Sequence, residues 1–244
     1  MDAEYTNGNY YLGEIFEIAL LSQSSGYIFH SYINISYRIS KYVKKLCNVT
    51  DAIIHRQGQP FRRVINDLIR FIKQEEEEET EATDTIIVGH GSYTTDFPLL
   101  LVNCMKAKYD YTQFKKFTFI DSMQVFKDKG YKRPGLDALS GETDRLFHSA
   151  TRDVELLRDI INRLSDDDIT TTTKYVYNLE DIIHYVNMKL PISIQHLYKL
   201  AAHNVTSYQC FESELYSRVN EKTALNSKQV CKIACRYFTM YSFL

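Results

Sequence analysis

The chain has 244 residues, of which 44% are hydrophobic and 25% charged, and its formal net charge is −2. This composition is ordinary for a globular protein with one sizeable domain, alone or with a small appendage. The near-neutral charge excludes a global basic field, so a nucleic-acid partner has to be held locally, by a cleft and by metal ions.

Cysteine usage and hydropathy bear on the location of the protein. The five cysteines are scattered without a Cys-x-x-Cys pair, which argues against a zinc site and favours free thiols in a reducing compartment. The first twelve residues are polar and aromatic and show no secretory signal. No apolar run approaches the ~18 residues of a membrane span. We therefore expect an intracellular protein, in the cytoplasm or nucleus, without a membrane partner.

The first elements predicted are two strands. Residues 14–22 and 27–35 are rich in β-branched and aromatic residues, and the turn signal at 24–26 joins them into a hairpin. A short helix follows over 36–46. Its basic face carries Arg38, Lys41, Lys44 and Lys45.

The clearest helix is predicted over residues 60–74. Pro60 suits a first turn, and apolar residues from Phe61 to Ile72 recur at helical spacing. The acidic run 75–79 that follows predicts a solvated linker, because closely spaced like charges repel each other and stay hydrated.

The next segments alternate between strand and helix. Short apolar runs at 85–89 and 117–121 are typical of buried parallel strands. Helical patterns occupy 97–107, a short stretch near 136–139, and 153–164. This alternation predicts an α/β domain over residues 1–164.

The last third of the chain has a different pattern. Residues 166–173 read as a linker of aspartates and threonines. Helical patterns follow at 179–188, 192–203, 210–219 and 227–241. We expect residues 165–244 to form a small helical carboxy-terminal extension, and nothing in it carries recognisable chemistry.

Four carboxylates and one imidazole stand in three separated clusters: Asp2 with Glu4, Asp96, and His148 with Asp153. Asp2 and Glu4 project to the same face of an extended strand. Asp96 follows the strand 85–89, where a loop starts the next helix, and Asp153 lies at the front of its helix.

These residue types suit phosphodiester hydrolysis. Hard divalent cations prefer oxygen ligands, and two of them about 4 Å apart can flank a scissile phosphate. A histidine such as His148 can take the proton of an attacking water near neutral pH. Alone, each residue has an ordinary explanation, such as a helix N-cap for Asp96 or a first-turn charge for Asp153. The combination is what indicates a two-metal site.

The order Asp-x-Glu, Asp, His-x4-Asp resembles the DEDDh family of three-prime to five-prime exonucleases, over residues 1–164. Residues 89–100, with their Asp-Phe-Pro-Leu-Leu ending, are most similar to the second motif of the three-prime repair (TREX-type) branch. Residues 147–154 resemble the third motif, and Phe119 to Ser122 resemble the strand between the two. The resemblance implies an RNase H-like, DnaQ-type fold with a mixed central sheet flanked by helices.

The resemblance also implies roles for individual residues. Two magnesium or manganese ions would be held by the four carboxylates, which are Asp2, Glu4, Asp96 and Asp153. His148 would be the general base, Tyr5 and Thr6 would contact the terminal nucleotide, and His90 would lie beside the substrate cleft. Tyr93 could stack on a base, although a tyrosine in such a loop more often packs locally. The implied reaction removes nucleoside monophosphates from three-prime ends of single-stranded DNA or RNA.

Two departures from the family pattern leave alternatives open. Only Met1 precedes Asp2, whereas the family has an apolar strand there, so the strand is shortened, the true start lies upstream, or the first metal site is compromised. Gly91 stands where the family usually has Asn, which concerns substrate positioning. The alternatives are a catalytically silent relative that acts as a binding or scaffold module, and an RNase H-like nuclease that has another polarity or cuts internally. The sequence does not choose firmly between DNA and RNA, although the TREX-like second motif leans towards DNA, and it does not indicate an oligomeric state.

Overall fold

The structure is a computed structural model that describes residues 1–6, 13–36, 38–78, 85–141, 148–163 and 173–189. The chain divides into two compact units, Met1–Ile182 and Ile183–Leu244. The description below concerns the first unit, which is mixed α/β as predicted.

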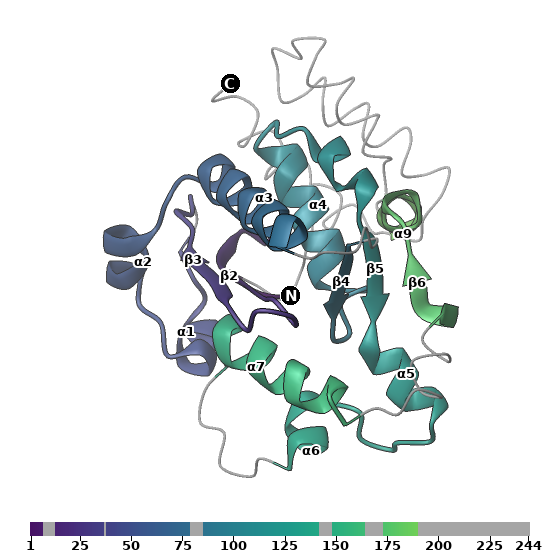
Figure 1. Ribbon diagram of the computed structural model, residues 1–244. Helices are drawn as coiled ribbons and strands as arrows, with labels where there is room; N and C mark the ends of the chain where they lie inside the picture. Colours follow the sequence, from purple (N-terminus) through teal and green to yellow (C-terminus); the bar gives the residue numbers. More distant parts are fainter. Residues whose placement is uncertain (7–12, 37, 79–84, 142–147, 164–172, 190–244) are drawn as a thin grey trace, which may run out of the picture. The chain divides into compact units, whose positions relative to one another are not determined.

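Three antiparallel strands form the first sheet, in the order β1-β2-β3 (Figure 1). They are β1 (Asp2–Tyr5), β2 (Ile15–Leu21) and β3 (Ile28–Tyr32). The predicted hairpin is confirmed as β2 and β3, and β3 ends three residues earlier than expected. In the β1–β2 register Asp2 lies opposite Ala19 and Glu4 opposite Glu17, so these four side chains share one face.

The second sheet contains both predicted parallel strands. Strands β4 (Ile86–Gly89) and β5 (Thr118–Asp121) are parallel, and the short β6 (Val176–Tyr177), which the sequence did not predict, pairs antiparallel with β5. The Met1 nitrogen donates a hydrogen bond to the Val88 carbonyl at 2.6 Å. This bond places the start of β1 beside β4 and connects the two sheets.

Eight α-helices are present in the described residues: α1 (Lys41–Cys47), α2 (Asp51–Gln57), α3 (Phe61–Glu78), α4 (Asp96–Lys106), α5 (Ser122–Asp128), α6 (Leu136–Ser140), α7 (Ala150–Ile161) and α9 (Leu179–Lys189). Two short 3₁₀ helices span Tyr111–Lys116 and Thr173–Tyr175. Six of the eight were predicted. The helix α1 begins later than expected because the Ser40 side chain caps it, and α7 begins earlier because Ser149 caps it. The sequence did not predict α2 and α5.

The acidic run after residue 74 corrects one prediction. Helix α3 continues to Glu78, so the expected linker at 75–79 is wrong for residues 75–78. The reason is that two of the glutamates have partners: Glu75 accepts a hydrogen bond from Ser25 Oγ at 2.6 Å, and Glu76 pairs with Lys116 Nζ at 3.1 Å. These contacts offset the repulsion between like charges.

Helices cover both sides of the strands. Figure 1 shows α3 and α4 on one side and α7 on the other. The face of β1 and β2 that carries Asp2 and Glu4 packs against α7, where Ala19 meets Ala150 and Val154. Small residues at this contact let the start of α7 approach the strands closely, which positions the residues around it.

The structure describes only some of the residues for which the carboxy-terminal elements were predicted. Helix α9 confirms the pattern at 179–188, and its Leu179 and Ile182 are buried. Most of the expected linker and the three patterns at 192–203, 210–219 and 227–241 lie outside the described residues, so the helical extension and its boundary at 164 stay predictions. Within the described residues, no helix is long and apolar enough to cross a membrane, and Cys47 and Cys104 are free and buried.

Candidate active site

Strand β1 presents two carboxylates to the face that α7 covers. Asp2 and Glu4 are separated by the buried Ala3, and both are half-buried. They point to the same side because side chains alternate along a strand. The expectation that the two share one face is confirmed by their register with Ala19 and Glu17 on β2.

Asp96 comes from the loop that follows β4. It is the first residue of α4 and is buried, and its carboxylate accepts hydrogen bonds from Ser92 Oγ at 2.7 Å and Thr95 Oγ1 at 3.1 Å. Gly91 in the same loop has φ +73°. Among residues with a side chain, Asn adopts this left-handed conformation most readily. The backbone therefore explains why Gly can stand where the family has Asn.

The third cluster lies at the start of α7. Ser149 caps this helix, so Asp153 falls in its first turn, where it is buried. His148 precedes the cap, and its backbone nitrogen donates to the Leu46 carbonyl at 2.9 Å. Its Nδ1 lies 3.8 Å from Asp153 Oδ2. One ligand atom each of Glu4, His148 and Asp153 lie within 4.8 Å of one another, so the structure brings strand and helix together as predicted.

Asp2 and Asp96 lie near this group, because the charges of Asp96, Asp153 and Glu4 all act on Asp2, while among the described residues only Glu4, His148 and Asp153 have ligand atoms within 4.8 Å of one another. Burial raises the pKa of Asp2 well above its usual value, and the nearby charges of Asp96, Asp153 and Glu4 raise it further. Burial also raises the pKa of Glu4, to about 7, while the hydrogen bond from the Cys47 thiol opposes the shift.

Asp96 follows the same rule. Its pKa is raised by burial, against the opposing hydrogen bonds from Ser92 and Thr95. The cluster is thus a set of oxygen donors that repel one another in a poorly solvated place. A divalent cation would relieve that repulsion, and oxygen-rich donor sets are those that magnesium and manganese prefer. The residues present therefore fit such ions.

Tyr5, predicted to contact substrate, is the last residue of β1, and Thr6, predicted to do the same, follows it. Tyr5 is half-buried, and its pKa is raised by burial and by the charges of Asp96, Glu4 and Asp2, so its hydroxyl lies near the acidic cluster. Thr6 is buried, and its Oγ1 accepts a hydrogen bond from the Glu14 nitrogen at 3.1 Å. In this structure Thr6 therefore secures the connection between β1 and β2.

His90 and Tyr93 contact the protein itself. His90 Nδ1 lies 2.9 Å from Ser122 Oγ, and its Nε2 lies 2.5 Å from the Pro134 carbonyl oxygen. The Tyr93 ring stacks on that of Tyr177 in β6, with centroids 3.8 Å apart and planes 13° apart. Tyr93 therefore packs against a ring from a distant segment of the chain, and its contact with a base stays a prediction.

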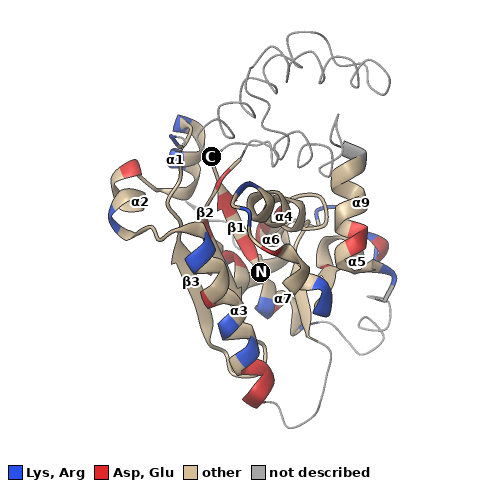
Figure 2. Ribbon diagram, turned by 90° about the horizontal axis from the view of Figure 1, so that it is seen from above, with Lys and Arg blue, Asp and Glu red and all other residues tan. Residues whose placement is uncertain are grey.

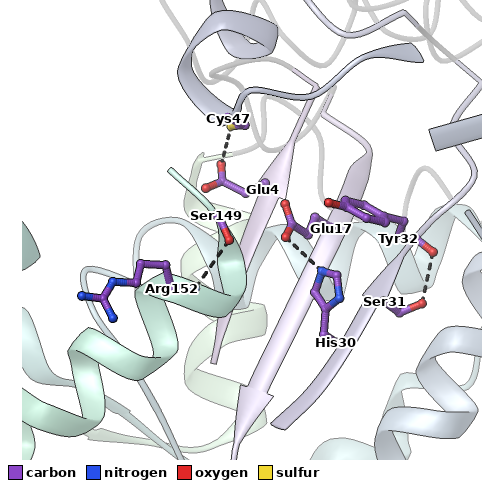
Figure 3. Close-up of polar contacts among 8 residues, drawn as sticks. All are labelled: Glu4, Glu17, His30, Ser31, Tyr32, Cys47, Ser149 and Arg152. Atoms are coloured by element: carbon purple, nitrogen blue, oxygen red, sulfur yellow. Dashed lines mark hydrogen bonds and ion pairs between the residues drawn. The ribbon is translucent and has the colours of Figure 1, made fainter. Parts of the chain in front are cut away.

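Sequence reasoning missed several residues that support the cluster. The Cys47 thiol donates to Glu4 Oε2 at 3.2 Å, as Figure 3 shows. The buried Asp121 accepts hydrogen bonds from the nitrogens of Gly91 and Tyr93, at 2.7 and 3.2 Å, and so fixes the loop that carries Asp96. An aspartate at the end of an apolar strand was the available signal for Asp121, and no signal marked Cys47.

Glu17 and His30 form a further pair on the same face of the sheet. Glu17 is 3% exposed, and its Oε1 lies 3.0 Å from His30 Nε2 (Figure 3). Because Glu17 lies opposite Glu4, a second glutamate stands beside the cluster, yet it has an imidazole partner of its own.

Comparisons with known proteins identify the fold. No protein-family model matches the chain, and neither does any curated protein. Among solved structures, the nuclease domain of 3'hExo, a DEDDh family member bound to rAMP, is 19% identical with a TM-score of 0.55 and covers 68% of this chain and 90% of its own. A 3'-exonuclease described with a histone mRNA stem-loop is 17% identical, has a TM-score of 0.54, and covers 68% and 80%. The predicted RNase H-like DEDDh exonuclease fold is therefore confirmed.

Proposed function

We propose that this chain is a metal-dependent exonuclease that removes nucleoside monophosphates from the three-prime end of single-stranded nucleic acid. The observation that carries the proposal is the convergence of Asp2, Glu4, Asp96 and Asp153 from three distant segments, with His148 beside them. The likeness of fold to DEDDh nuclease domains supports it.

In this proposal the four carboxylates hold two divalent cations. When bound, such ions neutralise the phosphate charge and lower the pKa of a coordinated water. Ser92 and Thr95 orient the Asp96 carboxylate by donating to its Oδ2, and Cys47 orients Glu4.

His148 is the proposed general base. Its side chain is 39% exposed, so water and substrate can reach it, and the bond from its backbone to Leu46 fixes its place beside Asp153. Since an imidazole titrates near neutral pH, His148 can accept the proton of the attacking water. Tyr5 is the proposed contact to the terminal nucleotide, because its hydroxyl lies near the cluster.

The choice between DNA and RNA stays part of the proposal. The Asp-Phe-Pro-Leu-Leu sequence from Asp96 resembles the TREX-type branch and points to DNA. The solved 3'hExo domain was bound to rAMP, a ribonucleotide, and points to RNA. The test therefore uses paired oligonucleotides of both kinds.

A degradation assay tests the function. Single strands labelled at the five-prime end are incubated with magnesium or manganese, with and without a blocked three-prime end. We expect a ladder that shortens from the three-prime end, no reaction on the blocked strand, and loss of reaction with Asp96→Asn or His148→Ala. Cutting of the blocked strand would instead show an internal nuclease. Binding without cleavage under either metal would identify a catalytically silent binding module.

A further inference from the structure

Helix α1 is connected at its start to the segment that follows β1, and at its end to Glu4 and His148. At its start, the Ser40 nitrogen donates to the carbonyl of Thr6, the residue after β1, at 3.4 Å. At its end, the Leu46 carbonyl accepts from the His148 nitrogen and the Cys47 thiol donates to Glu4. The position of α1 relative to the cluster is therefore fixed by three contacts.

The inner face of α1 is committed to the core. Val43 and Cys47 are buried in a cluster with Phe16 and Ile54. Lys44 Nζ forms an ion pair of 2.5 Å with Asp51, which links α1 to the start of α2. The opposite face of α1 therefore points outward, away from the core.

The outer face of α1 is cationic and carries an aromatic ring. Lys41 and Lys45, one helical turn apart, are exposed. Arg38 just before the helix is exposed too, and its charge also acts on Asp51. Neither lysine forms an ion pair with another described residue. Tyr42 between them is 74% exposed, an unusual position for so large a ring. We call Arg38, Lys41, Tyr42 and Lys45 the α1 surface; Figure 2 shows the basic residues of α1 in blue.

The setting of the α1 surface indicates its ligand. The whole chain has a net charge of −2, and the neighbouring cluster is acidic. Neither attracts a polyanion, so basic side chains near the cluster have to supply that attraction. A patch of lysines and arginine interleaved with an exposed aromatic ring matches the combination that binds single strands, in which cations track phosphates and rings stack on bases. Across seven helical residues the rise is about 9 Å, so Lys41 lies within a few nucleotides of the cluster.

We propose that the α1 surface binds the sugar-phosphate backbone of single-stranded nucleic acid upstream of the terminal nucleotide. Arg38, Lys41 and Lys45 pair with phosphates, and Tyr42 stacks on a base. This inference rests on the proposed function and deepens it, because it assigns a binding surface to the part of the strand upstream of the terminal nucleotide.

A salt titration tests the proposal without requiring catalysis. Binding of a fluorescent twelve-nucleotide single strand is measured without divalent cations, for the unmodified chain and for the double variant Lys41→Ala, Lys45→Ala. The slope of log affinity against log salt should fall by about 1.4, since each phosphate contact on a single strand contributes about 0.7. Tyr42→Ala should weaken binding by about tenfold, within the range for one base stacked on an aromatic ring.

The control removes two cations elsewhere, of which Arg70 forms an ion pair with Asp67 at 2.8 Å. Arg70 and Lys73 are exposed on the second half of α3. In this half Glu76 contacts Thr85, the residue before β4, whereas the loop that carries Asp96 follows the other end of β4. The double variant Arg70→Ala, Lys73→Ala should leave the salt slope unchanged. An equal fall in slope in both double variants, or an unchanged slope in the α1 variant, would overturn the proposal. Alanine favours the helix at each site, so the variants should fold, which circular dichroism checks.

Cleavage assays distinguish binding at the α1 surface from the reaction at the acidic cluster. In the Lys41→Ala, Lys45→Ala variant, KM for the twelve-nucleotide strand should rise at least about fivefold, while hydrolysis of a dinucleotide stays within twofold, because the dinucleotide does not reach α1. If the unmodified chain cleaves nothing but the salt slopes differ as expected, the α1 surface stands and the proposed exonuclease activity fails. An equal loss on both substrates would show that the two lysines act on the acidic cluster and not on the strand.

Discussion

Glu4 and Glu17 lie directly opposite each other on β1 and β2, on the same face of the sheet, yet their surroundings differ. Glu17 is buried with one imidazole, that of His30, at 3.0 Å. Glu4 receives a thiol hydrogen bond from Cys47 and otherwise faces the carboxylate of Asp153 and the ring of His148.

The difference shows what separates a structural carboxylate from a candidate ligand. A buried carboxylate with a good partner has its hydrogen-bonding needs met inside the protein. A buried carboxylate among other carboxylates does not: burial first, and the charge of Asp153 in addition, raise the pKa of Glu4 to about 7. The position on the strand is equivalent for both residues. The segments packed over them, α1 and the start of α7 for Glu4, decide their roles.

The largest expected effect comes from exchanging each glutamate for its amide. Glu4→Gln should lower kcat/KM for a single strand by about 100-fold or more, because a metal-assisted reaction loses several kcal/mol when a ligand is removed. Glu17→Gln should keep activity within about tenfold. Its free energy of unfolding should fall by about 1–3 kcal/mol, since the exchange leaves a buried polar contact imperfect.

Activity assays and urea unfolding measure the two outcomes in parallel. The variants are matched in chemistry and in position across the strand pair, so each serves as control for the other. Equal loss of activity in both variants would show that Glu4 has no special place in the reaction.

Metal binding should distinguish the same two residues in the absence of substrate. A cation that binds only the folded state at 100 times its Kd stabilises by about 2.7 kcal/mol, which raises Tm by about 5 °C or more for a chain of this size. We expect manganese to raise the Tm of the unmodified chain and of Glu17→Gln, and to have little effect on Glu4→Gln. Differential scanning fluorimetry gives the values, and equal shifts in all three proteins would contradict a role for Glu4 in binding the ion.

The pH dependence of stability follows from the raised pKa of Glu4. Its usual value of 4.5 applies to the unfolded chain, whereas about 7 applies to the folded one. Between these values the folded state binds more protons, so the metal-free protein loses stability as pH rises from about 4.5 to 7. Thermal melts at pH 5 and 7.5 should show the lower Tm at pH 7.5. Glu4→Gln should reduce this difference, and a difference as large as in the unmodified chain would assign the effect to other groups.

The fold was largely predictable because its core elements carry strong local patterns. The stripe from Phe61 to Ile72 predicts a helix, and the apolar runs at β4 and β5 predict two strands, of which β5 is mostly buried and β4 only partly, with Ile86 53% exposed. The acidic end of α3 was not predictable, because Lys116 and Ser25, which offset its charges, come from distant segments. The two-residue β6 is too short to carry a pattern and depends on pairing with β5.

The candidate site divides in the same way. Asp96 and Asp153 were predictable from their places at the starts of helices, and the structure brings both to the cluster. The contacts that orient them were not, since Asp121 acts across the loop on the backbone of Gly91. The packing of Tyr93 against Tyr177 was also hidden, because 84 residues separate the two rings. Sequence identified the groups that carry charge, while the fold determines what holds each group in place.

The smallest expected effect concerns Cys47, the one contact of Glu4 that is neither charged nor predicted. Its thiol hydrogen bond favours the ionised carboxylate and so lowers the pKa of Glu4 against the stronger effect of burial. Cys47→Ala removes the bond, so the pKa of Glu4 should rise and cation binding should require a higher pH. We expect the midpoint of a manganese-dependent activity profile to move upward by less than about one pH unit.

Cys47→Ser is the control, because a hydroxyl can donate in place of the thiol, and its profile should stay near that of the unmodified chain. A profile that moves equally in both variants would trace the shift to altered packing of α1. A profile that moves in neither would show that the carboxylates and His148, and not the thiol, set the protonation of Glu4. The comparison with Glu17 would then rest on the imidazole of His30 alone.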